Sequence, residues 1–182
     1  MKKILIVGAG AMGAAFSIPL LDNGHSVTLT EPYNFKLLQK LNSKKKIHPS
    51  LNLNLPKKLK INKFSSDILN QKWDLIVIAV SSIGIDLIGK NLSKIKNKSP
   101  ILVLTKGLKL DGRNLISMSS LLRKYNKNLN ISVLKGPCLA KELAKKVKSF
   151  TVVANKNINT AKKIGKLIST NYYQTEFSRD VN

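Results

Sequence analysis

The sequence predicts an α/β fold with a doubly wound, mostly parallel sheet and helices on both faces. Residues 4–7 are an unbroken β-branched and aliphatic run, typical of a parallel strand buried on both faces. Gly8, Gly10 and Gly13 follow with the spacing G-x-G-x-x-G and lead into a helix of small residues. Strand-like and helix-like segments then alternate to the end of the chain, as βαβ crossovers require. Together these observations predict a Rossmann-type fold.

Each glycine of this loop has a separate physical role. Gly8 permits a tight turn, Gly10 lets a phosphate approach the backbone without meeting a Cβ atom, and Gly13 lets the helix pack closely on the strand. Ala11 and Met12 begin the helix, whose free N–H groups and positive dipole end would face a pyrophosphate. We therefore predict that these five residues bind a dinucleotide. The competing interpretation is a glycine-rich turn with a structural role alone.

Length and charge limit the number of domains and the kinds of partner that the chain can have. With 182 residues the chain is long enough for one sizeable core, so we expect one domain over residues 1–182. Its formal net charge is +23, from 32 Lys and Arg against 9 Asp and Glu. Such a balance is typical of proteins that bind nucleic acid. The lysines are spread along the chain without interleaved aromatics or a groove-binding motif. We expect no specific nucleic-acid partner and a field that attracts anionic substrates.

Cysteine usage and the N-terminus indicate the compartment. Cys138 is the single cysteine, which excludes an internal disulfide, and with only His25 and His48 available the sequence predicts no metal site. This usage is typical of a reducing compartment. The charged and apolar start imitates a signal peptide, but cleavage there would remove the first strand together with the glycine loop. No run reaches transmembrane length, so we expect a cytoplasmic protein without a membrane span.

The first half of the chain predicts a βαβ unit and a polar connection. A helix is expected over residues 11–23 and a strand over 26–30. Glu31 ends that strand about 20 residues beyond the loop, where an acid accepts hydrogen bonds from ribose hydroxyls and repels a 2′-phosphate. The alternative is a surface glutamate before a proline turn. We expect a short helix over 33–41, an irregular stretch over 42–58 with His48 on the surface, and a short strand over 59–62.

The second half continues the alternation. A helix begins near Ser65, and residues 73–80 predict a strong strand that delivers Ser82 to the carboxyl edge of the sheet, where we expect it to contact the dinucleotide. A helix over 83–95 and a strand over 101–105 follow. Lys106, directly after that strand, is placed to meet an anionic or hydroxyl-bearing ligand, unless it is one exposed lysine among many. The remaining expected elements are helix 115–125, strand 131–134, helix 138–146, strand 150–154, helix 160–169 and strand 172–175.

Several short motifs carry a family resemblance. They are the glycine fingerprint, His48-Pro49 with Leu55-Pro56, Ala79-Val80-Ser81-Ser82, Thr105-Lys106-Gly107-Leu108, and Gly136-Pro137-Cys138-Leu139-Ala140-Lys141-Glu142. With them the chain resembles the NAD(P)-dependent glycerol-3-phosphate dehydrogenases of the bacterial type along its whole length. The last string is similar to that family's "G-P-S-F-A-x-E" and separates it from other Rossmann dehydrogenases. Tyr173-Gln174-Thr175, with Ser178 to Val181, looks like the approach to the family's catalytic domain.

The resemblance implies an activity and roles for individual residues. The activity is reversible hydride transfer between C2 of glycerol 3-phosphate and C4 of the nicotinamide, which interconverts the substrate with dihydroxyacetone phosphate. Lys106 would contact substrate and cofactor, Gly136 and the Cys138 position would line the substrate end, and Ala140 would contact the cofactor. The cofactor carries the hydride chemistry, while the protein supplies orientation and charge.

Three departures from the family pattern qualify this expectation. Cys138 stands where the family usually has Ser, so a hydroxyl hydrogen bond becomes a weak thiol one. Glu31 stands where many bacterial members carry a basic or small residue, which favours NAD as the cofactor and leaves NADP as the alternative. The chain stops at Asn182, before the family's helical C-terminal domain and its general-base lysine.

The third departure shapes the functional hypothesis. No residue of this chain matches the family lysine, so we predict no catalytic residue within it and a chain that binds dinucleotide but is severely impaired as a dehydrogenase alone. A homodimer or a missing C-terminal domain are the macromolecular partners this suggests. The alternatives are a dinucleotide-binding module without chemistry, a basic nucleic-acid binder, and another hydroxyacid or 6-phosphogluconate-type dehydrogenase, which the Gly136 to Glu142 string argues against.

Overall fold

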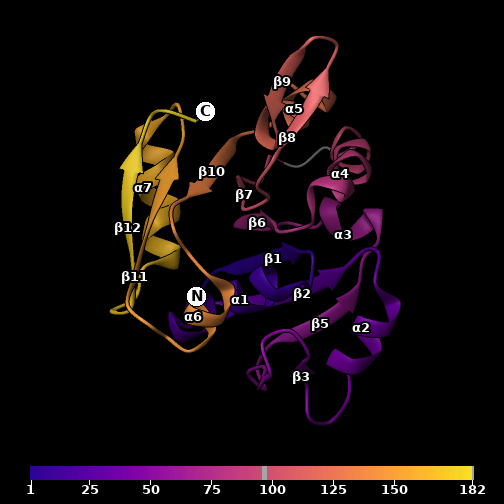
Figure 1. Ribbon diagram of the computed structural model, residues 1–182, viewed down its shortest axis with the longest axis vertical. Helices are drawn as coiled ribbons and strands as arrows, with labels where there is room; N and C mark the ends of the chain where they lie inside the picture. Colours follow the sequence, from indigo (N-terminus) through magenta and orange to yellow (C-terminus); the bar gives the residue numbers. More distant parts are fainter. Residues whose placement is uncertain (96–97, 182) are drawn as a thin grey trace.

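The computed structural model describes residues 1–95 and 98–181 (Figure 1). In this part of the chain the main sheet has eight strands in the order β12-β11-β10-β7-β6-β1-β2-β5. These strands are β1 (Lys3–Val7), β2 (Ser26–Glu31), β5 (Lys60–Lys63), β6 (Leu75–Ile78), β7 (Ile101–Val103), β10 (Ile131–Lys135), β11 (Ser149–Ala154) and β12 (Tyr173–Ser178). Two small antiparallel pairs stand apart from it, β3 (Ile47–His48) with β4 (Leu53–Asn54) and β8 (Leu108–Asp111) with β9 (Asn114–Ser117).

Helices cover both faces of the sheet. They are α1 (Ala11–Asp22), α2 (Phe35–Leu41), α3 (Ser66–Asn70), α4 (Ile85–Leu92), α5 (Met118–Tyr125), α6 (Ala140–Ala144) and α7 (Ile158–Ile168), with a 3₁₀ turn η1 (Ser82–Gly84) before α4. Side chains of α1, α2, α6 and α7 share one hydrophobic core with the sheet, and those of α3, α4 and α5 share another. The doubly wound α/β prediction is therefore confirmed.

The central strand β1 belongs to both cores. Ile4 and Ile6 point into the core under α1, whereas Leu5 and Val7 point into the core under α4, and all four side chains are fully buried. β1 pairs in parallel with β2 on one side and with β6 on the other. A strand with two buried faces has no polar face, which explains why residues 4–7 show no alternation.

The order of the strands places a crevice beside β1. From β1 the chain passes through α1 to β2 on one side, and later returns to β6 on the opposite side. The loops that leave β1 and β6 therefore diverge at the carboxyl edge of neighbouring strands, the topological switch point at which open α/β sheets bind ligands. The glycine loop and residues 79–82 lie at this point.

Two strands, β11 and β12, run opposite to the other six strands of the sheet and depart from the predicted parallel alternation. β11 runs antiparallel to β10, and β12 then pairs in parallel with β11. A parallel crossover must carry the chain back along the full length of the strand, usually with a helix of several turns. The connecting helix α6 has five residues and packs against α1, so the chain enters β11 from the same end at which it left β10.

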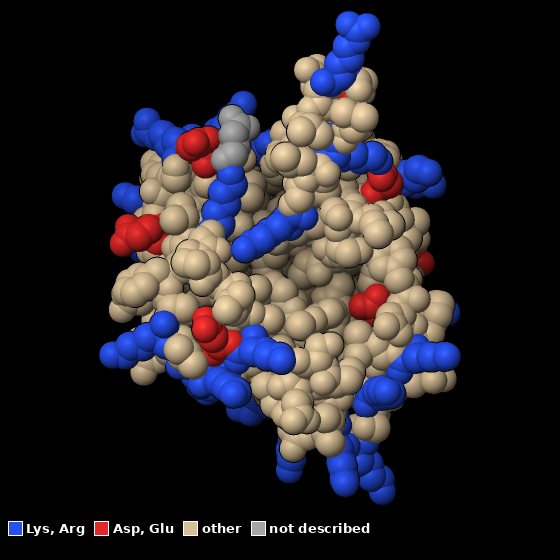
Figure 2. Space-filling view, viewed as in Figure 1, with Lys and Arg blue, Asp and Glu red and all other residues tan. Residues whose placement is uncertain are grey.

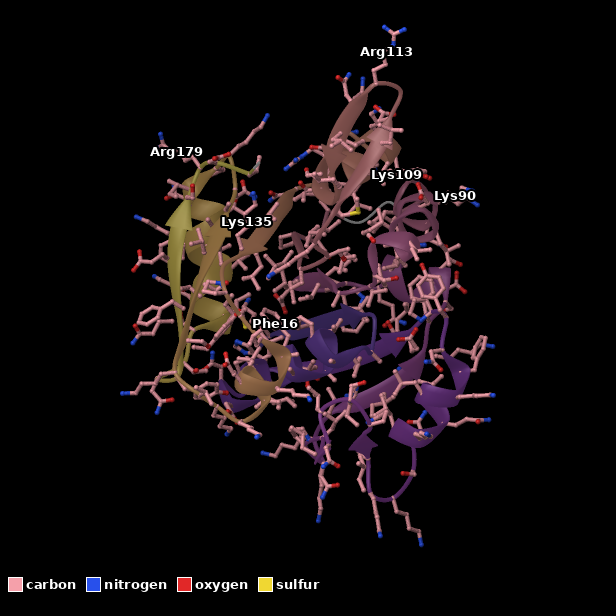
Figure 3. The ribbon with its side chains drawn as sticks, viewed as in Figure 1. Phe16, Lys90, Lys109, Arg113, Lys135 and Arg179 are labelled. Carbon is pink, nitrogen blue, oxygen red and sulfur yellow. The ribbon has the colours of Figure 1, made fainter. Side chains whose placement is uncertain are left out.

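Two hairpins were not predicted. The stretch over residues 42–58 contains the β3–β4 pair, and the predicted helix over 115–125 starts only at Met118 because residues 114–117 form β9. β8 and β9 pair across a turn at Gly112, whose φ of +61° suits glycine. Arg113 in this turn points away from the body of the protein (Figure 3). The local signal was Gly112 itself, which occupies the first central position of the two-residue turn, where hairpins favour glycine.

We expect Ile6→Ala to lower the free energy of unfolding by about 2–5 kcal/mol, because it leaves a cavity in the core against α1. Ile83→Ala is the matched control, since Ile83 is 91% exposed, and it should change the free energy by less than about 0.5 kcal/mol. Urea denaturation followed by circular dichroism measures both values. Equal losses for the two variants would contradict the assignment of β1 as the central strand.

Candidate functional site

The glycine loop is wedged between the ends of β2 and β6. Gly8 has a φ of +108°, and a Cβ atom at this residue would lie 2.7 Å from the backbone of Ala79 and Val80. The Gly8 N–H donates a hydrogen bond to the Thr30 carbonyl at 2.8 Å. Only a residue without a side chain fits this conformation and this approach, so the turn at Gly8 brings the loop against the carboxyl edge of both neighbouring strands.

Gly10 and Gly13 face opposite environments. A Cβ atom at Gly13 would lie 1.9 Å from the Gly8 carbonyl oxygen, so close packing of α1 on its own loop requires glycine there. A Cβ atom at Gly10 would meet nothing within 4 Å, and Gly10 has an ordinary φ of −62°. Neither packing nor backbone strain demands glycine at Gly10, so an approaching ligand is the remaining physical reason for the missing side chain.

The N-terminus of α1 opens beside Gly10. Gly10 is the N-cap, and no side chain caps the helix. The first N–H groups of a helix lack intrahelical partners and carry the positive end of its dipole. Because α1 extends over twelve residues, this end has a full helix behind it. The arrangement is suited to binding a phosphate or another anion.

Glu31 is buried and holds backbone groups around the loop. One carboxylate oxygen, Oε2, accepts a hydrogen bond from the Ala9 N–H at 2.8 Å. The other, Oε1, accepts from the N–H groups of Tyr33 and Asn34 at 2.9 and 3.1 Å. The interpretation of Glu31 as a surface residue is therefore wrong, since the residue is 6% exposed.

The structure also contradicts the prediction made for His48. The expectation that it lies on the surface is wrong, because the side chain is 1% exposed. Its Nε2 lies 2.9 Å from the Ala9 carbonyl oxygen, and its Nδ1 accepts a hydrogen bond from the Leu51 N–H at 3.3 Å. Periodicity in a polar stretch could not reveal this position, because the partner of His48 lies 39 residues away in the chain.

Tyr33 is a further residue of the site that sequence patterns missed. Its hydroxyl donates a hydrogen bond to the Gly84 carbonyl at 2.5 Å, which joins the end of β2 to the turn before α4. Burial, followed by the negative charges of Glu31 and Asp86, raises the pKa of Tyr33 to about 12. The hydroxyl therefore keeps its proton and its role as a donor at neutral pH.

A cleft of about 320 Å³ opens at the carboxyl edge of the sheet. It is lined by Met12, Ala79, Val80, Ser81, Ser82, Leu104, Thr105, Lys106, Cys138, Leu139 and Ala140. Met12, Ser82, Lys106, Cys138 and Ala140 were candidate site residues, and the structure brings them together although they come from four different segments of the chain. Space-filling representation shows a hollow in the centre of this face, with Lys and Arg distributed around the rim (Figure 2).

Lys106 forms the wall between this cleft and a second cavity. Its Nζ donates a hydrogen bond to the Gly136 carbonyl at 3.3 Å. Both Lys106 and Gly136 line the second cavity, of about 360 Å³, which lies against β10 and the start of α5. Lys106 is exposed and lines both spaces. It can therefore attract an anionic ligand in either one.

Cys138 lies below the surface of the cleft. It is 6% exposed, and burial raises the pKa of its thiol, an effect that the nearby Lys106 charge partly offsets. A thiol with a raised pKa stays protonated at neutral pH and is a poor nucleophile. Cys138 thus acts as a small, weakly polar part of the wall. In the described part of the chain, no group of three or more His, Cys, Asp or Glu residues could hold a metal ion.

The length of the helices bears on membrane association. Among the described residues, no helix combines the length and the apolar character needed to span a bilayer.

Comparison with known proteins decides the family. The model of the NAD-dependent glycerol-3-phosphate dehydrogenase N-terminus matches residues 3–161. The chain belongs to this family. A glycerol-3-phosphate dehydrogenase [NAD(P)+] of Leptospira biflexa is 32% identical over 98% of the chain and 54% of its own length. The chain therefore spans about half the length of the curated glycerol-3-phosphate dehydrogenases that it matches.

Solved structures agree with the fold. The crystal structure of glycerol-3-phosphate dehydrogenase from Coxiella burnetii has a TM-score of 0.81 at 23% identity, covering 98% of this chain and 54% of that one. The glycerol-3-phosphate dehydrogenase of Plasmodium falciparum has a TM-score of 0.87 at 17% identity, covering 99% and 53%. At such identities the likeness concerns the fold alone.

Alanine at Gly10 and at Gly13 should have very different consequences for stability. Gly13→Ala forces a methyl group into the Gly8 carbonyl, and we expect it to cost about 2–3 kcal/mol or more. Gly10→Ala adds a methyl group in open space at the N-cap, so the entropic gain and the weaker cap offset each other and the free energy of unfolding should change by less than about 1 kcal/mol. Chemical denaturation of the two variants checks this, and a large loss for Gly10→Ala would contradict the open space beside it.

Proposed function

We propose that this chain is the cofactor-binding part of an NAD-dependent glycerol-3-phosphate dehydrogenase. The observation that carries the proposal is Gly10, the one position of the loop where only an incoming ligand explains a missing side chain, beside the uncapped N-terminus of α1. Membership of the family supplies the ligand class, a nicotinamide dinucleotide. The pyrophosphate would lie on the N–H groups of Gly10, Ala11 and Met12, at the switch point of the sheet.

The two ends of the dinucleotide would extend in opposite directions from the loop. Glu31, at the end of β2, would face the adenosine ribose, and three of the roughly four acceptor positions of its carboxylate are already filled by backbone N–H groups. The remaining position, on Oε2, would accept a ribose hydroxyl. The nicotinamide end would enter the cleft between Ser82, Lys106 and Ala140.

The reaction we propose is that of the family, the interconversion of glycerol 3-phosphate and dihydroxyacetone phosphate. The cofactor supplies hydride transfer at its nicotinamide ring. Lys106 would hold the anionic or hydroxyl-bearing substrate at the wall shared by the two cavities, where Gly136 and Cys138 would shape the substrate end. A proton acceptor within hydrogen-bond reach of the C2 hydroxyl completes such a reaction. We assign cofactor binding to residues 1–182 and the complete reaction to the family as a whole.

Titration with NADH tests this function. We expect residues 1–182 to bind NADH with 1:1 stoichiometry, followed by the fluorescence of the reduced nicotinamide, and Gly10→Ala to weaken binding about tenfold or more because its methyl group meets the pyrophosphate. A second titration with glycerol 3-phosphate separates a dehydrogenase from a module that binds the dinucleotide alone. Failure of the unaltered chain to bind NADH would sink the proposal, and binding of NADH without any effect of glycerol 3-phosphate would favour the module.

We further propose that Glu31 selects NAD over NADP. A 2′-phosphate beside a buried carboxylate meets a repulsion of a few kcal/mol, so we expect NADH to bind at least about tenfold more tightly than NADPH. Glu31→Gln should reduce this ratio toward one. The ratio of the two dissociation constants is the quantity to measure, since any shift of the glycine loop affects both cofactors alike. A preserved ratio in Glu31→Gln would assign the selection to another residue.

A further inference from the structure

The backbone of Ala9 is held by side chains on both sides. Its N–H donates to Glu31 Oε2 at 2.8 Å, and its carbonyl oxygen lies 2.9 Å from His48 Nε2. Both side chains are more than nine-tenths buried, as is Ala9 itself. We call this arrangement of Glu31, Ala9 and His48 the Ala9 clamp. The clamp lies immediately before Gly10, the residue beside the proposed pyrophosphate.

The protonation of the His48 ring follows from its neighbours. The Leu51 N–H can only donate, so the Nδ1 that faces it is an acceptor and carries no proton. The proton of the neutral ring is then on Nε2, which donates it to the Ala9 carbonyl. Leu51 and Leu55 are buried beside β3 and β4 and anchor this segment in the core. His48 therefore presents a donor of fixed direction to the glycine loop.

Peptide geometry transmits this direction to Gly10. The Ala9 carbonyl and the Gly10 N–H belong to one planar trans peptide, in which they point in opposite directions. With its carbonyl held against His48, this peptide directs the Gly10 N–H away from His48. Within the described residues the Gly10 N–H donates to no other group. The bond from Glu31 to the Ala9 N–H fixes the preceding peptide in the same way, so two successive peptide planes are oriented by side chains.

We propose that His48 is a positioning residue for dinucleotide binding, holding the Gly10 N–H in the orientation that receives the pyrophosphate. This inference rests on the proposed function and adds a residue outside the glycine fingerprint. Without the donor at Nε2, the buried Ala9 carbonyl loses its hydrogen-bond partner. The Ala9–Gly10 peptide would then rotate so that this carbonyl finds another donor. That rotation would turn a carbonyl oxygen, which repels phosphate, toward the place of an N–H donor.

Asparagine and glutamine at His48 separate the clamp from local packing. An asparagine amide reaches the position of Nδ1, beside the Leu51 N–H, but is too short to reach the Ala9 carbonyl. A glutamine amide extends to the position of Nε2 and keeps a donor for that carbonyl. His25 supplies a matched control, because its Nε2 also contacts a backbone carbonyl, that of Leu167 at 3.1 Å, beyond the opposite end of α1 from the glycine loop.

The experiment compares ADP, which contains the pyrophosphate, with adenosine, which does not, by isothermal titration calorimetry. We expect His48→Asn to weaken ADP binding about tenfold while adenosine binding stays within about twofold of the unaltered chain. His48→Gln should restore ADP affinity to within about threefold, and His25→Asn should leave both ligands unaffected. The free energy of unfolding of each variant is measured alongside.

Three outcomes would overturn the inference. Unchanged ADP affinity in His48→Asn would show that the loop orients itself without the clamp. An equal loss for ADP and adenosine, in step with a loss of stability, would assign His48 a purely structural role. Equal weakening of ADP binding in His48→Gln and His48→Asn would exclude the Nε2 donor as the cause. Absence of ADP and NADH binding in the unaltered chain is a different result, because it removes the proposed function itself.

Discussion

The structure depends on the close approach of the Gly8 backbone to the backbone of Ala79 and Val80. A Cβ atom at Gly8 would lie 2.7 Å from that backbone, so the contact excludes every side chain at this position. It brings the loop after β1 against the end of β6. The loops after β1 and β6 therefore lie close together at the switch point, and the uncapped N-terminus of α1 lies beside them. The cleft lined by Ser82 and Lys106 owes its position to the same contact, because its walls are the ends of β6 and β7. Thr105 joins these two ends through a hydrogen bond to the Val80 carbonyl at 2.8 Å.

Buried polar side chains further fix the conformation of the loop after β1. A loop that leaves a central strand carries N–H and C=O groups that neither sheet nor helix can satisfy. Glu31 and His48 provide partners for those of Ala9, and Tyr33 provides one for the Gly84 carbonyl. Each of these bonds joins segments far apart in the sequence. The side chains that form hydrogen bonds to the loop also give it a fixed shape. The same hydrogen bonds therefore satisfy buried polar groups and orient the loop for binding an anion.

The strongly positive charge acts in a general way. The net charge of +23 comes from lysines and arginines spread along the whole chain, and those visible in Figure 2 lie at many places on the surface. The cleft itself is lined mainly by apolar and hydroxyl side chains with Lys106. A diffuse field of this sign raises the local concentration of phosphorylated ligands, whereas recognition depends on the few groups inside the cleft. This division is consistent with a family whose substrate and cofactor are both anionic.

The sequence by itself determined the α/β class, the central strand, the glycine loop and the family, because burial on two faces and the spacing of glycines are local patterns. It also named five residues that the cleft assembles, through their places after predicted strands or within family motifs. The tertiary structure alone decided the reversed course of β11 and β12 and the burial of Glu31 and His48. These features depend on partners distant in the chain: α6 packs on α1, and Ala9 precedes His48 by 39 residues. Local periodicity carries no information about such contacts, so a polar side chain that looks solvated in sequence becomes, in the folded protein, the partner of a buried backbone group.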